Sequence, residues 1–256
     1  MDIKKDVKDQ FGRSADHYVE SMGHRAGWDL KKMIEMANPK GDELVLDVAT
    51  GGGHMANALA PHVKKVTALD LTPEMLAAAK KFIKANGHFN VAFVEGDAEQ
   101  LPFEDESFDL VTCRIAPHHF PNVESFVAEV HRVLKYGGKF LLDDNVAPEV
   151  DAYDEFYNKI EKLRDYSHYR AWKKTEWITM LETKGFEIQA LHRFEKRFSF
   201  DSWCDRMNMP SSEKQALTEI IRNASDQVKD RFRVELEDRK VIAFVGEAAL
   251  VNAVKR

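Results

Sequence analysis

The sequence predicts an α/β fold in which a doubly wound, mostly parallel sheet of seven strands carries helices on both faces. Two observations predict it. Short apolar runs alternate with helical segments between residues 44 and 142, and strands that alternate with helices need crossover connections, which pair them in parallel. In addition, the first apolar run leads directly into three glycines, residues 51–53. A glycine turn between a buried strand and a helix is typical of doubly wound sheets.

Each element of the first half follows from a local pattern. Leu30, Met33 and Ala37 recur at helical spacing and predict a helix over residues 28–37. Thr72 and Pro73 predict a helix start with a hydroxyl N-cap and a first-turn proline. Similar patterns predict strands over residues 44–48, 66–69, 91–94, 108–113 and 139–142, and helices over residues 54–61, 72–86 and 123–134.

The last third of the chain is richer in helices. Helical patterns cover residues 153–164, 175–184 and 212–223, and two apolar stretches, 186–191 and 248–254, predict the last two strands at one edge of the sheet. The polar stretch between these strands, residues 201–240, is then a helical cover inserted before the last strand.

Composition narrows the class of function. The formal net charge of −6 comes from interspersed acidic and basic residues, so no basic stripe predicts a nucleic-acid partner. Cys113 and Cys204 form neither a disulfide framework nor a zinc motif, which favours a cytoplasmic protein without a metal. No apolar run approaches the roughly 18 residues of a membrane span, and residues 1–10 lack the apolar core of a signal peptide. A small-molecule substrate is therefore expected, and a homodimer is left open.

Candidate binding residues lie where the predicted strands end. In an open parallel sheet, ligands bind beyond the carboxyl ends of the strands. The first strand is followed by glycines, which let a ligand approach the backbone, and by a helix whose free amide groups can bind an anion. The candidates at this end are Asp47, Ala49, Thr50, Gly51 and Gly53.

The next two strand ends carry acids. Asp70 can accept hydrogen bonds from both hydroxyl groups of a ribose. Asp97, followed by Ala98, can accept a hydrogen bond from the exocyclic amine of an adenine. Each acid taken alone fits a helix cap equally well, but their order along the sheet matches an amino acid, a ribose and an adenine.

These residues make the chain resemble the class I S-adenosylmethionine-dependent methyltransferases. It is most similar to the small-molecule group that includes the ubiquinone and menaquinone biosynthesis methyltransferases. Two departures are Ala49, where the family has its first glycine, and Tyr136, where it often has proline. The matching segments are VLDVATGGGHMA (45–56), VTALDLTPEML (66–76), VEGDAEQLPF (94–103), FDLVTCRIAPHHF (108–120) and VLKYGGKFLL (133–142).

The resemblance implies a Rossmann-like methyltransferase fold and S-adenosylmethionine as cofactor. It divides a single domain, residues 1–256, into N-terminal helices (1–40), a cofactor-binding core (41–145) and substrate-side helices with the final strands (146–256). Its implied contacts are Asp47, Gly51 and Gly53 to the methionine part, Asp70 and Leu71 to the ribose and adenine, Asp97 and Ala98 to the adenine, Arg114 to the methionine carboxylate or the substrate, and Tyr18, with Phe11 and Ala15, on an N-terminal helix that closes over the cofactor.

Two histidines are the candidate catalytic residues. Methyl transfer from a sulfonium is an in-line displacement, and it needs a general base only when the acceptor must lose a proton. His118 and His119 follow the fourth strand, and we favour His119; structural packing is the alternative for each. The acids Asp143 and Asp144, which end the fifth strand, either reach the same space or cap the following turn.

Two other functions also fit these residues, and a third is disfavoured. Gly51, Gly53 and Ala56, with Asp70 downstream, also satisfy the fingerprint of a nicotinamide-dependent oxidoreductase. A non-catalytic S-adenosylmethionine-binding protein is a second alternative. Methylation of nucleic-acid bases is disfavoured, because residues 114–117 lack the Asn/Asp-Pro-Pro-Tyr signature. The acceptor atom, whether O, N or C, is left open.

Overall fold

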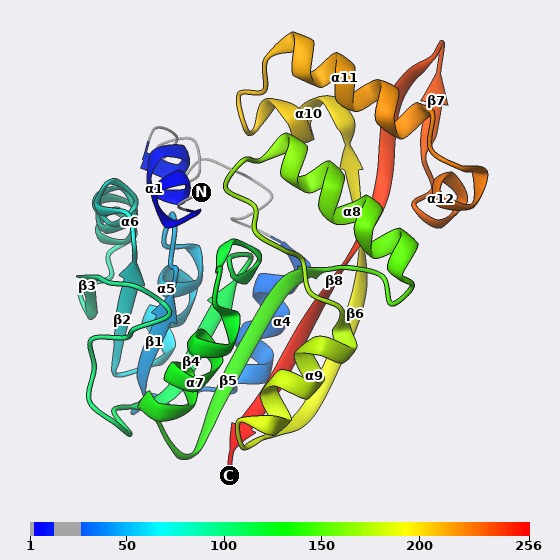
Figure 1. The fold of residues 1–256 in the computed structure, drawn as a ribbon. Helices are drawn as coiled ribbons and strands as arrows, with labels where there is room; N and C mark the ends of the chain where they lie inside the picture. The colour runs from blue at the N-terminus through cyan, green and yellow to red at the C-terminus, as the bar shows by residue number, and fades with distance from the viewer. Residues whose placement is uncertain (1–2, 13–26) are drawn as a thin grey trace.

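The computed structural model describes residues 3–12 and 27–256. Seven strands form one sheet in the order β3-β2-β1-β4-β5-β8-β6 (Figure 1). Pairing is parallel from β3 to β5, and β8 runs antiparallel to both β5 and β6, so the predicted doubly wound, mostly parallel sheet is confirmed. The strands are β1 (Leu44–Val48), β2 (Lys65–Asp70), β3 (Val91–Glu95), β4 (Phe108–Arg114), β5 (Leu134–Val146), β6 (Phe186–Ser199) and β8 (Lys240–Lys255), with a short β7 (Glu235–Glu237) paired to β8.

Helices cover both faces of this sheet. In Figure 1, α7 and α9 lie in front of it and α4 lies behind. The helices are α1 (Ile3–Gly12), α4 (Trp28–Ala37), α5 (His54–Leu59), α6 (Pro73–Ala85), α7 (Val123–Val133), α8 (Asp151–Arg164), α9 (Lys174–Thr183), α10 (Phe200–Asp205), α11 (Ser211–Arg222) and α12 (Asp226–Arg231), with short 3₁₀ turns η1 (Ala60–His62) and η2 (Pro117–His119).

The central strands are mostly apolar because both of their faces are covered. Val45 packs with α4 and α5 on one face, and its neighbour Leu46 packs in the cluster of α7 and α9 on the other. Successive side chains of a strand point to opposite faces, so a strand between two helical layers is apolar on both faces instead of alternating apolar with polar residues. The packing fixes the strand ends along one rim of the sheet.

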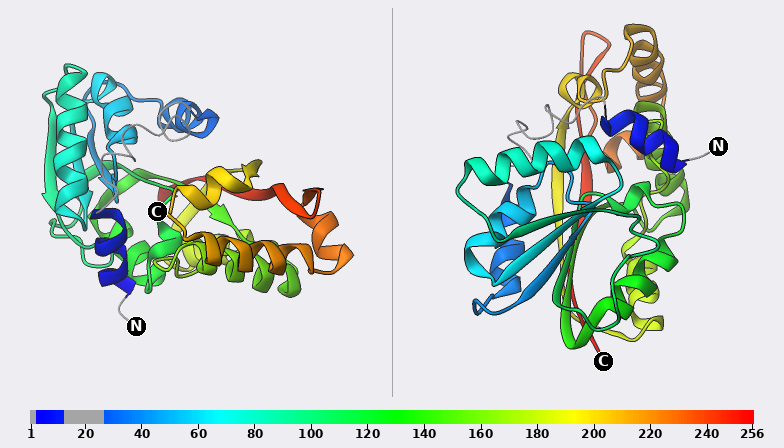
Figure 2. Two further views of the ribbon diagram at one scale, coloured as in Figure 1. Left: turned by 90° about the horizontal axis from the view of Figure 1, so that it is seen from above. Right: turned by 90° about the vertical axis from the view of Figure 1, so that its left-hand side faces the viewer.

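The last three long strands extend further than the sequence predicted. β5 continues to Val146, and β8 begins at Lys240, eight residues before the predicted start. The apolar pattern did not predict the extension of β5, because the strand continues through Asp143, Asp144 and Asn145, whose side chains are polar. The extended ends carry the helical cover of α8, α10, α11 and α12, as the two views in Figure 2 also show.

One helix start is correct in position but not in mechanism. Thr72 is the N-cap of α6 and Pro73 is its first residue, as predicted, but the Thr72 side chain makes no capping hydrogen bond. Instead, the carboxylate of Asp70 accepts a hydrogen bond from the Thr72 amide. Within the described parts of the chain, no helix is both long enough and apolar enough to cross a membrane.

Candidate active site

A first cavity opens beyond the carboxyl ends of β1, β2 and β4. It is lined by most of the residues that the sequence singled out for the cofactor: Asp47, Ala49, Thr50, Gly51, Asp70, Leu71, Asp97, Ala98 and Arg114, together with His119. Tyr18 and Ala15 lie outside the described residues. Residues far apart in the sequence therefore meet along one rim of the sheet, as the strand-end argument predicted.

The glycine loop contains three residues with left-handed backbone. Ala49, Gly51 and Gly53 have φ angles of 52°, 55° and 80°. Gly53 does not line the cavity: a Cβ atom there would lie 2.9 Å from both Ala79 Cβ and Ile83 Cδ1 of α6. Gly53 thus has a packing role, because it lets α5 start directly against α6, and its ligand contact stays a prediction.

Asp47 is held by two hydroxyl groups. Thr50 Oγ1 and Thr112 Oγ1 donate to its two carboxylate oxygens at 2.6 and 2.7 Å. Burial raises the pKa of Asp47 to about 6, although both hydrogen bonds favour the charged form. The carboxylate is thus a fixed acceptor on the cavity wall.

Asp70 organises the backbone of the same wall. Its Oδ2 accepts from the Gly51 amide at 2.8 Å, and its Oδ1 accepts from the Thr72 amide at 2.9 Å. Burial raises the pKa of this carboxyl, and the two amide bonds oppose the shift. Since each carboxylate oxygen has a second lone pair, both can still accept from a ribose hydroxyl.

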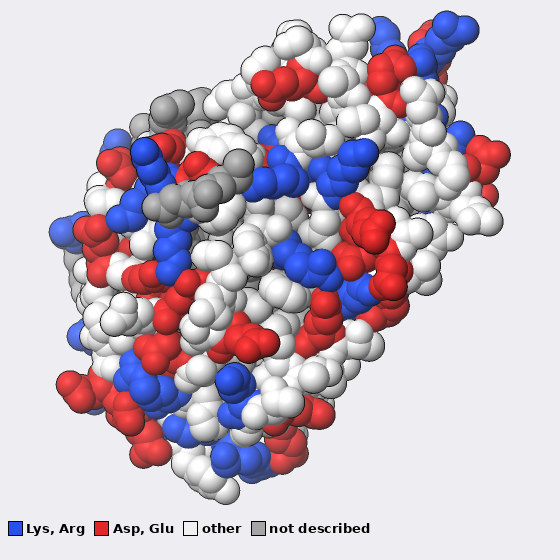
Figure 3. Space-filling model, viewed as in Figure 1, with Lys and Arg blue, Asp and Glu red and all other residues white. Residues whose placement is uncertain are grey.

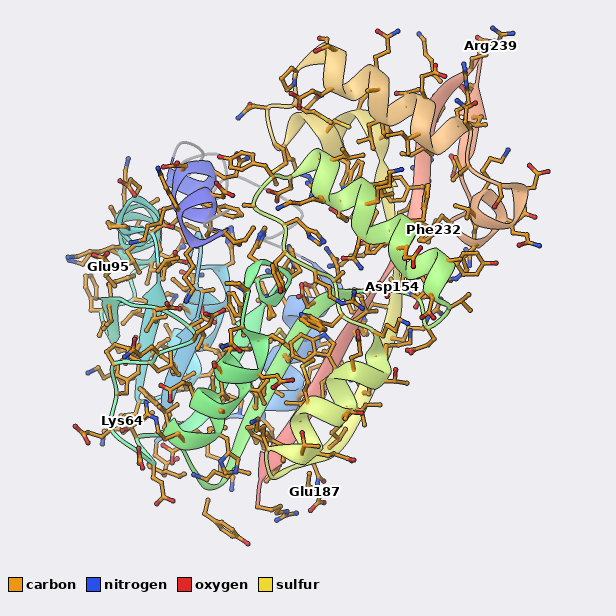
Figure 4. The ribbon with its side chains drawn as sticks, in the orientation of Figure 1. Lys64, Glu95, Asp154, Glu187, Phe232 and Arg239 are labelled. Atoms are coloured by element: carbon orange, nitrogen blue, oxygen red, sulfur yellow. The ribbon has the colours of Figure 1, made fainter. Side chains whose placement is uncertain are left out.

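Helix α1 covers the cavity beside Asp97. Lys4 Nζ lies 2.6 Å from Asp97 Oδ2 and 2.5 Å from Glu99 Oε2, and Val7 and Phe11 of the same helix line the wall. Lys8 reaches Glu95, labelled in Figure 4 at the end of β3, at 3.8 Å. The sequence argument found Asp97 but missed Lys4, since nothing in the sequence places residue 4 over the third strand.

Arg114 lies in a buried group of charges. Its guanidinium is 2.5 Å from Asp29 of α4 and 3.9 Å from Asp143 of β5. Burial would raise the pKa of Asp29, but the charges of Arg114 and Lys196 and the hydrogen bonds to Asp143 and Arg114 together outweigh it and lower the pKa. Burial and the charge of Asp29 raise the pKa of Asp143 to about 7. The predicted role of Arg114 toward a ligand carboxylate therefore competes with an acid of the protein itself.

A second cavity adjoins the first on the side of the helical cover. It lies between the end of β4, the upper part of β6, α8 and α10. Phe11, Ile115 and His119 line both cavities, so they form the junction between them. Ile115 has a φ of 55°, which is an outlier for a β-branched residue and is typical of strain kept at functional sites.

Trp203 and Met207 line the second cavity. No signal in the sequence marks them for this cavity, because more than eighty positions separate them from the two histidines. Among the described residues, no group of three or more His, Cys, Asp or Glu side chains is arranged to hold a metal ion.

His118 forms a buried dyad with Asp144. His118 Nδ1 lies 2.6 Å from Asp144 Oδ1, and the His118 amide donates to Asp144 Oδ2 at 2.8 Å. Burial would lower the pKa of His118, but the charge and hydrogen bond of Asp144 outweigh it and raise the pKa. Since a carboxylate only accepts, Nδ1 carries the proton and Nε2 is the basic atom of the neutral ring.

His119 is held differently. Its Nδ1 donates to the backbone carbonyl oxygen of Ser167 at 3.0 Å, and its Nε2 lies 4.0 Å from Asp165 Oδ2. Burial and the neighbouring His118 lower the pKa of His119 to about 4. The ring is therefore neutral at neutral pH, and the edge of Phe11 packs against it with centroids 5.1 Å apart.

Several known proteins resemble this chain in sequence and in fold. A family profile described as a methyltransferase domain matches residues 46–142. The protein named uncharacterized methyltransferase YcgJ, from Bacillus subtilis (strain 168), is 38% identical over 96% of this chain and 98% of its own length. This chain belongs to the class I S-adenosylmethionine-dependent methyltransferases.

Two further relatives agree with this family. The crystal structure of BH2331 from Bacillus halodurans C-125 has a TM-score of 0.88 and 56% identity, covering 90% of this chain and 99% of that one. A demethylmenaquinone methyltransferase from Porphyromonas gingivalis is 32% identical over 59% of this chain and 65% of its own length. The family confirms the resemblance drawn from the strand-end motifs and speaks against the oxidoreductase alternative.

Proposed function

We propose that this protein transfers a methyl group from S-adenosylmethionine to a small-molecule acceptor, with the cofactor in the first cavity and the acceptor in the second. The observation that carries the proposal is the junction: Phe11, Ile115 and His119 border both cavities. A displacement in line needs donor and acceptor to meet at one shared point, and this junction offers it.

The residues of the first cavity fit the cofactor. Asp70 offers two carboxylate oxygens for ribose hydroxyls, and Asp97 offers one for an adenine amine beside Ala98. When bound, S-adenosylmethionine supplies a methyl group on a positively charged sulfur. Buried Asp47 and the loop at Gly51 would bind its amino-acid end, and α1 would exclude water through Lys4 and Phe11.

On the acceptor side we assign the general base to His118 rather than to His119. His118 lines the second cavity, and Asp144 fixes its tautomer so that Nε2 can take a proton. His119 has a weakly basic ring, with its Nε2 near Asp165, and would position the acceptor at the junction. Positioning of this kind can supply about 7–11 kcal/mol in favourable cases.

A base at this place favours an acceptor atom that carries a removable proton. A hydroxyl group or an acidic carbon needs this proton removed, whereas a neutral amine attacks through its own lone pair. We therefore propose O- or C-methylation. The face in Figure 3 intersperses Lys and Arg with Asp and Glu, which supports a small acceptor over a nucleic acid.

The remaining parts of the proposal rest on the sequence. Residues 1–256 would act as one methyltransferase domain, and the free, buried Cys113 and Cys204 support a cytoplasmic location.

Calorimetry tests the cofactor. We expect binding of S-adenosylmethionine and its demethylated product, and none of NAD or NADP. Incubation with methyl-labelled S-adenosylmethionine and a small-molecule extract then tests transfer. Binding without any labelled product would point to the non-catalytic alternative, and binding of a dinucleotide alone would refute the proposal.

A further inference from the structure

One wall of the acceptor cavity carries an unusual distribution of charge. This wall is formed by the upper half of β6 and by α10 with the residues after it (Figure 1). Four basic side chains, Arg164, Lys196, Arg197 and Arg206, and three acidic ones, Asp29, Glu161 and Asp165, line the cavity as a whole.

The three acids already have partners within the protein. Asp29 pairs with Arg114 at 2.5 Å, and Glu161 pairs with Arg164 at 2.8 Å. Asp165 accepts from the Ser167 hydroxyl at 2.5 Å and from the Ser167 amide at 2.9 Å. The acidic side chains of the cavity are thus satisfied without a bound cation.

Lys196 is different. Its Nζ donates to the neutral side-chain oxygen of Asn145 at 3.1 Å and lies 5.5 Å from the ring centroid of Phe194. Within the described part of the chain, no carboxylate lies at ion-pairing distance from it. Its neighbour Arg197, in contrast, pairs with Glu235. Lys196 therefore brings a positive charge to the cavity wall with only a neutral acceptor for its three N–H groups.

Two acids act on Lys196 from further away, since Asp29 and Asp143 both interact with it electrostatically. Both also lie close to Arg114: Asp29 is paired with it at 2.5 Å, and Asp143 is 3.9 Å from it. Arg114 and Lys196 thus share the two acids, and the shorter ion pair belongs to Arg114.

The residues around Lys196 indicate the chemical nature of the rest of the bound acceptor. Phe198 and Trp203 line the same side of the cavity, and Ile115 and Met207 add further apolar surface. Aromatic and apolar walls of this kind bind a planar or hydrocarbon body, and a small number of polar groups then fix its orientation.

We propose that the methyl acceptor is a carboxylic acid whose carboxylate binds Lys196, while its nucleophilic group lies at His118 and the junction. A carboxylate fits better than a phosphate monoester because one unpaired lysine matches one negative charge. This inference rests on the proposed function, and it adds the chemical class of the acceptor.

The test uses the full-length protein, methyl-labelled S-adenosylmethionine and a small-molecule extract that anion exchange at pH 7 has separated into an anionic and a non-anionic pool. We expect label in the anionic pool, both before and after that pool is treated with phosphatase. Lys196→Met should lower the labelling rate at least about tenfold at low acceptor concentration, as for loss of a hydrogen bond to a charged group. Lys196→Arg should recover most of the rate.

Lys159→Met is the matched control, because Lys159 is exposed on α8 and lines neither cavity. Calorimetry should give the same affinity for S-adenosylmethionine in all four proteins. Label in the non-anionic pool, loss of label after phosphatase, or an unaffected Lys196→Met variant would overturn the carboxylate site and leave methyl transfer standing. No label in either pool would overturn the proposed function itself.

Discussion

The two cavities differ in how they are built. The walls of the cofactor cavity come mainly from residues 47–121, in turns directly after β1, β2, β3 and β4. The walls of the acceptor cavity come from segments spread between residues 11 and 207, and many of them lie on the extended ends of β5 and β6. A local motif can specify the first kind of site, whereas the second depends on long-range packing.

The two cavities also differ in the groups that hold their polar side chains in place. In the cofactor cavity, backbone amides of Gly51 and Thr72 fix the carboxylate of Asp70. In the acceptor cavity, side chains fix one another, as in the pair of His118 and Asp144. Substitutions on the two sides should therefore affect different quantities: fold and cofactor affinity on one side, and turnover on the other.

The largest expected effect is on the acceptor side. His118→Ala removes the proposed base and should lower kcat by about 10²–10⁴-fold. The affinity for S-adenosylmethionine should be unchanged, since His118 lines only the second cavity. Turnover of labelled cofactor and calorimetry measure the two quantities. His119→Ala is the comparison: it too should lower turnover with cofactor affinity nearly unchanged, but by less, and a larger loss there would return the base to His119.

The pH dependence sharpens this assignment. A general base must be neutral, and Asp144 raises the pKa of His118, so kcat/KM should be low in acid and rise as pH passes a value above 6.5. Asp144→Asn removes the charge that holds the proton, and it should move this rise to lower pH while also lowering the maximal rate. If kcat/KM of Asp144→Asn rises at the same pH as in the unchanged protein, a group other than His118 controls this rise.

The next largest effect is a loss of folding stability, and it concerns the glycine loop beside the first cavity. Gly53→Ala places a Cβ 2.9 Å from two atoms of α6 at a φ of 80°. Left-handed strain and overpacking should together lower the free energy of unfolding by roughly 2–4 kcal/mol. Gly41→Ala is the control: its φ is 103°, but nothing lies within 4 Å of the added atom. Urea unfolding should show a clearly smaller loss there, and equal losses would argue against the contact with α6.

The same contrast explains what could be predicted from the sequence. Asp47, Asp70 and Asp97 were found because each lies at or just after the end of a predicted strand, and parallel strands bring their ends together. The core strands were predicted for the same reason, since apolar runs and glycine turns are local signals. Helix boundaries agreed within a residue or two wherever a proline, glycine or asparagine marks the end.

The acceptor side lacked such signals. For Asp144 the sequence left two roles open, reaching the space of the histidines or capping a turn. It did not predict the hydrogen bond to His118, because this bond spans twenty-six positions and depends on the continued pairing of β5 with β8. Lys196 lies on a strand that the apolar pattern ended at residue 191, and Lys4 meets Asp97 only after α1 has packed over the sheet. These residues follow from tertiary structure, and no period or motif marks them.

A smaller effect tests whether α1 belongs to the cofactor side. Lys4→Met removes the pair with Asp97 and Glu99, and the dissociation constant for S-adenosylmethionine should rise about two- to fivefold, as for a partly exposed ion pair. The rise should shrink at high salt because the charges are screened. Lys8→Met, on the same helix but outside the cavity, should change nothing. Tighter binding by Lys4→Met would mean that Lys4 competes with the adenine for Asp97.

The smallest expected effect has the opposite sign. Ala49 has a φ of 52°, where the family has glycine, and left-handed backbone costs an alanine about 1–2 kcal/mol. Ala49→Gly removes this strain, but the more flexible unfolded chain offsets about 0.4–1 kcal/mol of the gain, so the net gain in unfolding free energy should lie between about zero and about 1.6 kcal/mol. Ala77→Gly, exposed in the middle of α6, should instead lose about 1 kcal/mol. Changes of opposite sign in the free energy of unfolding, measured in urea, would show that the left-handed backbone at residue 49 favours glycine. Equal losses of stability would show that the Ala49 methyl group contributes to packing.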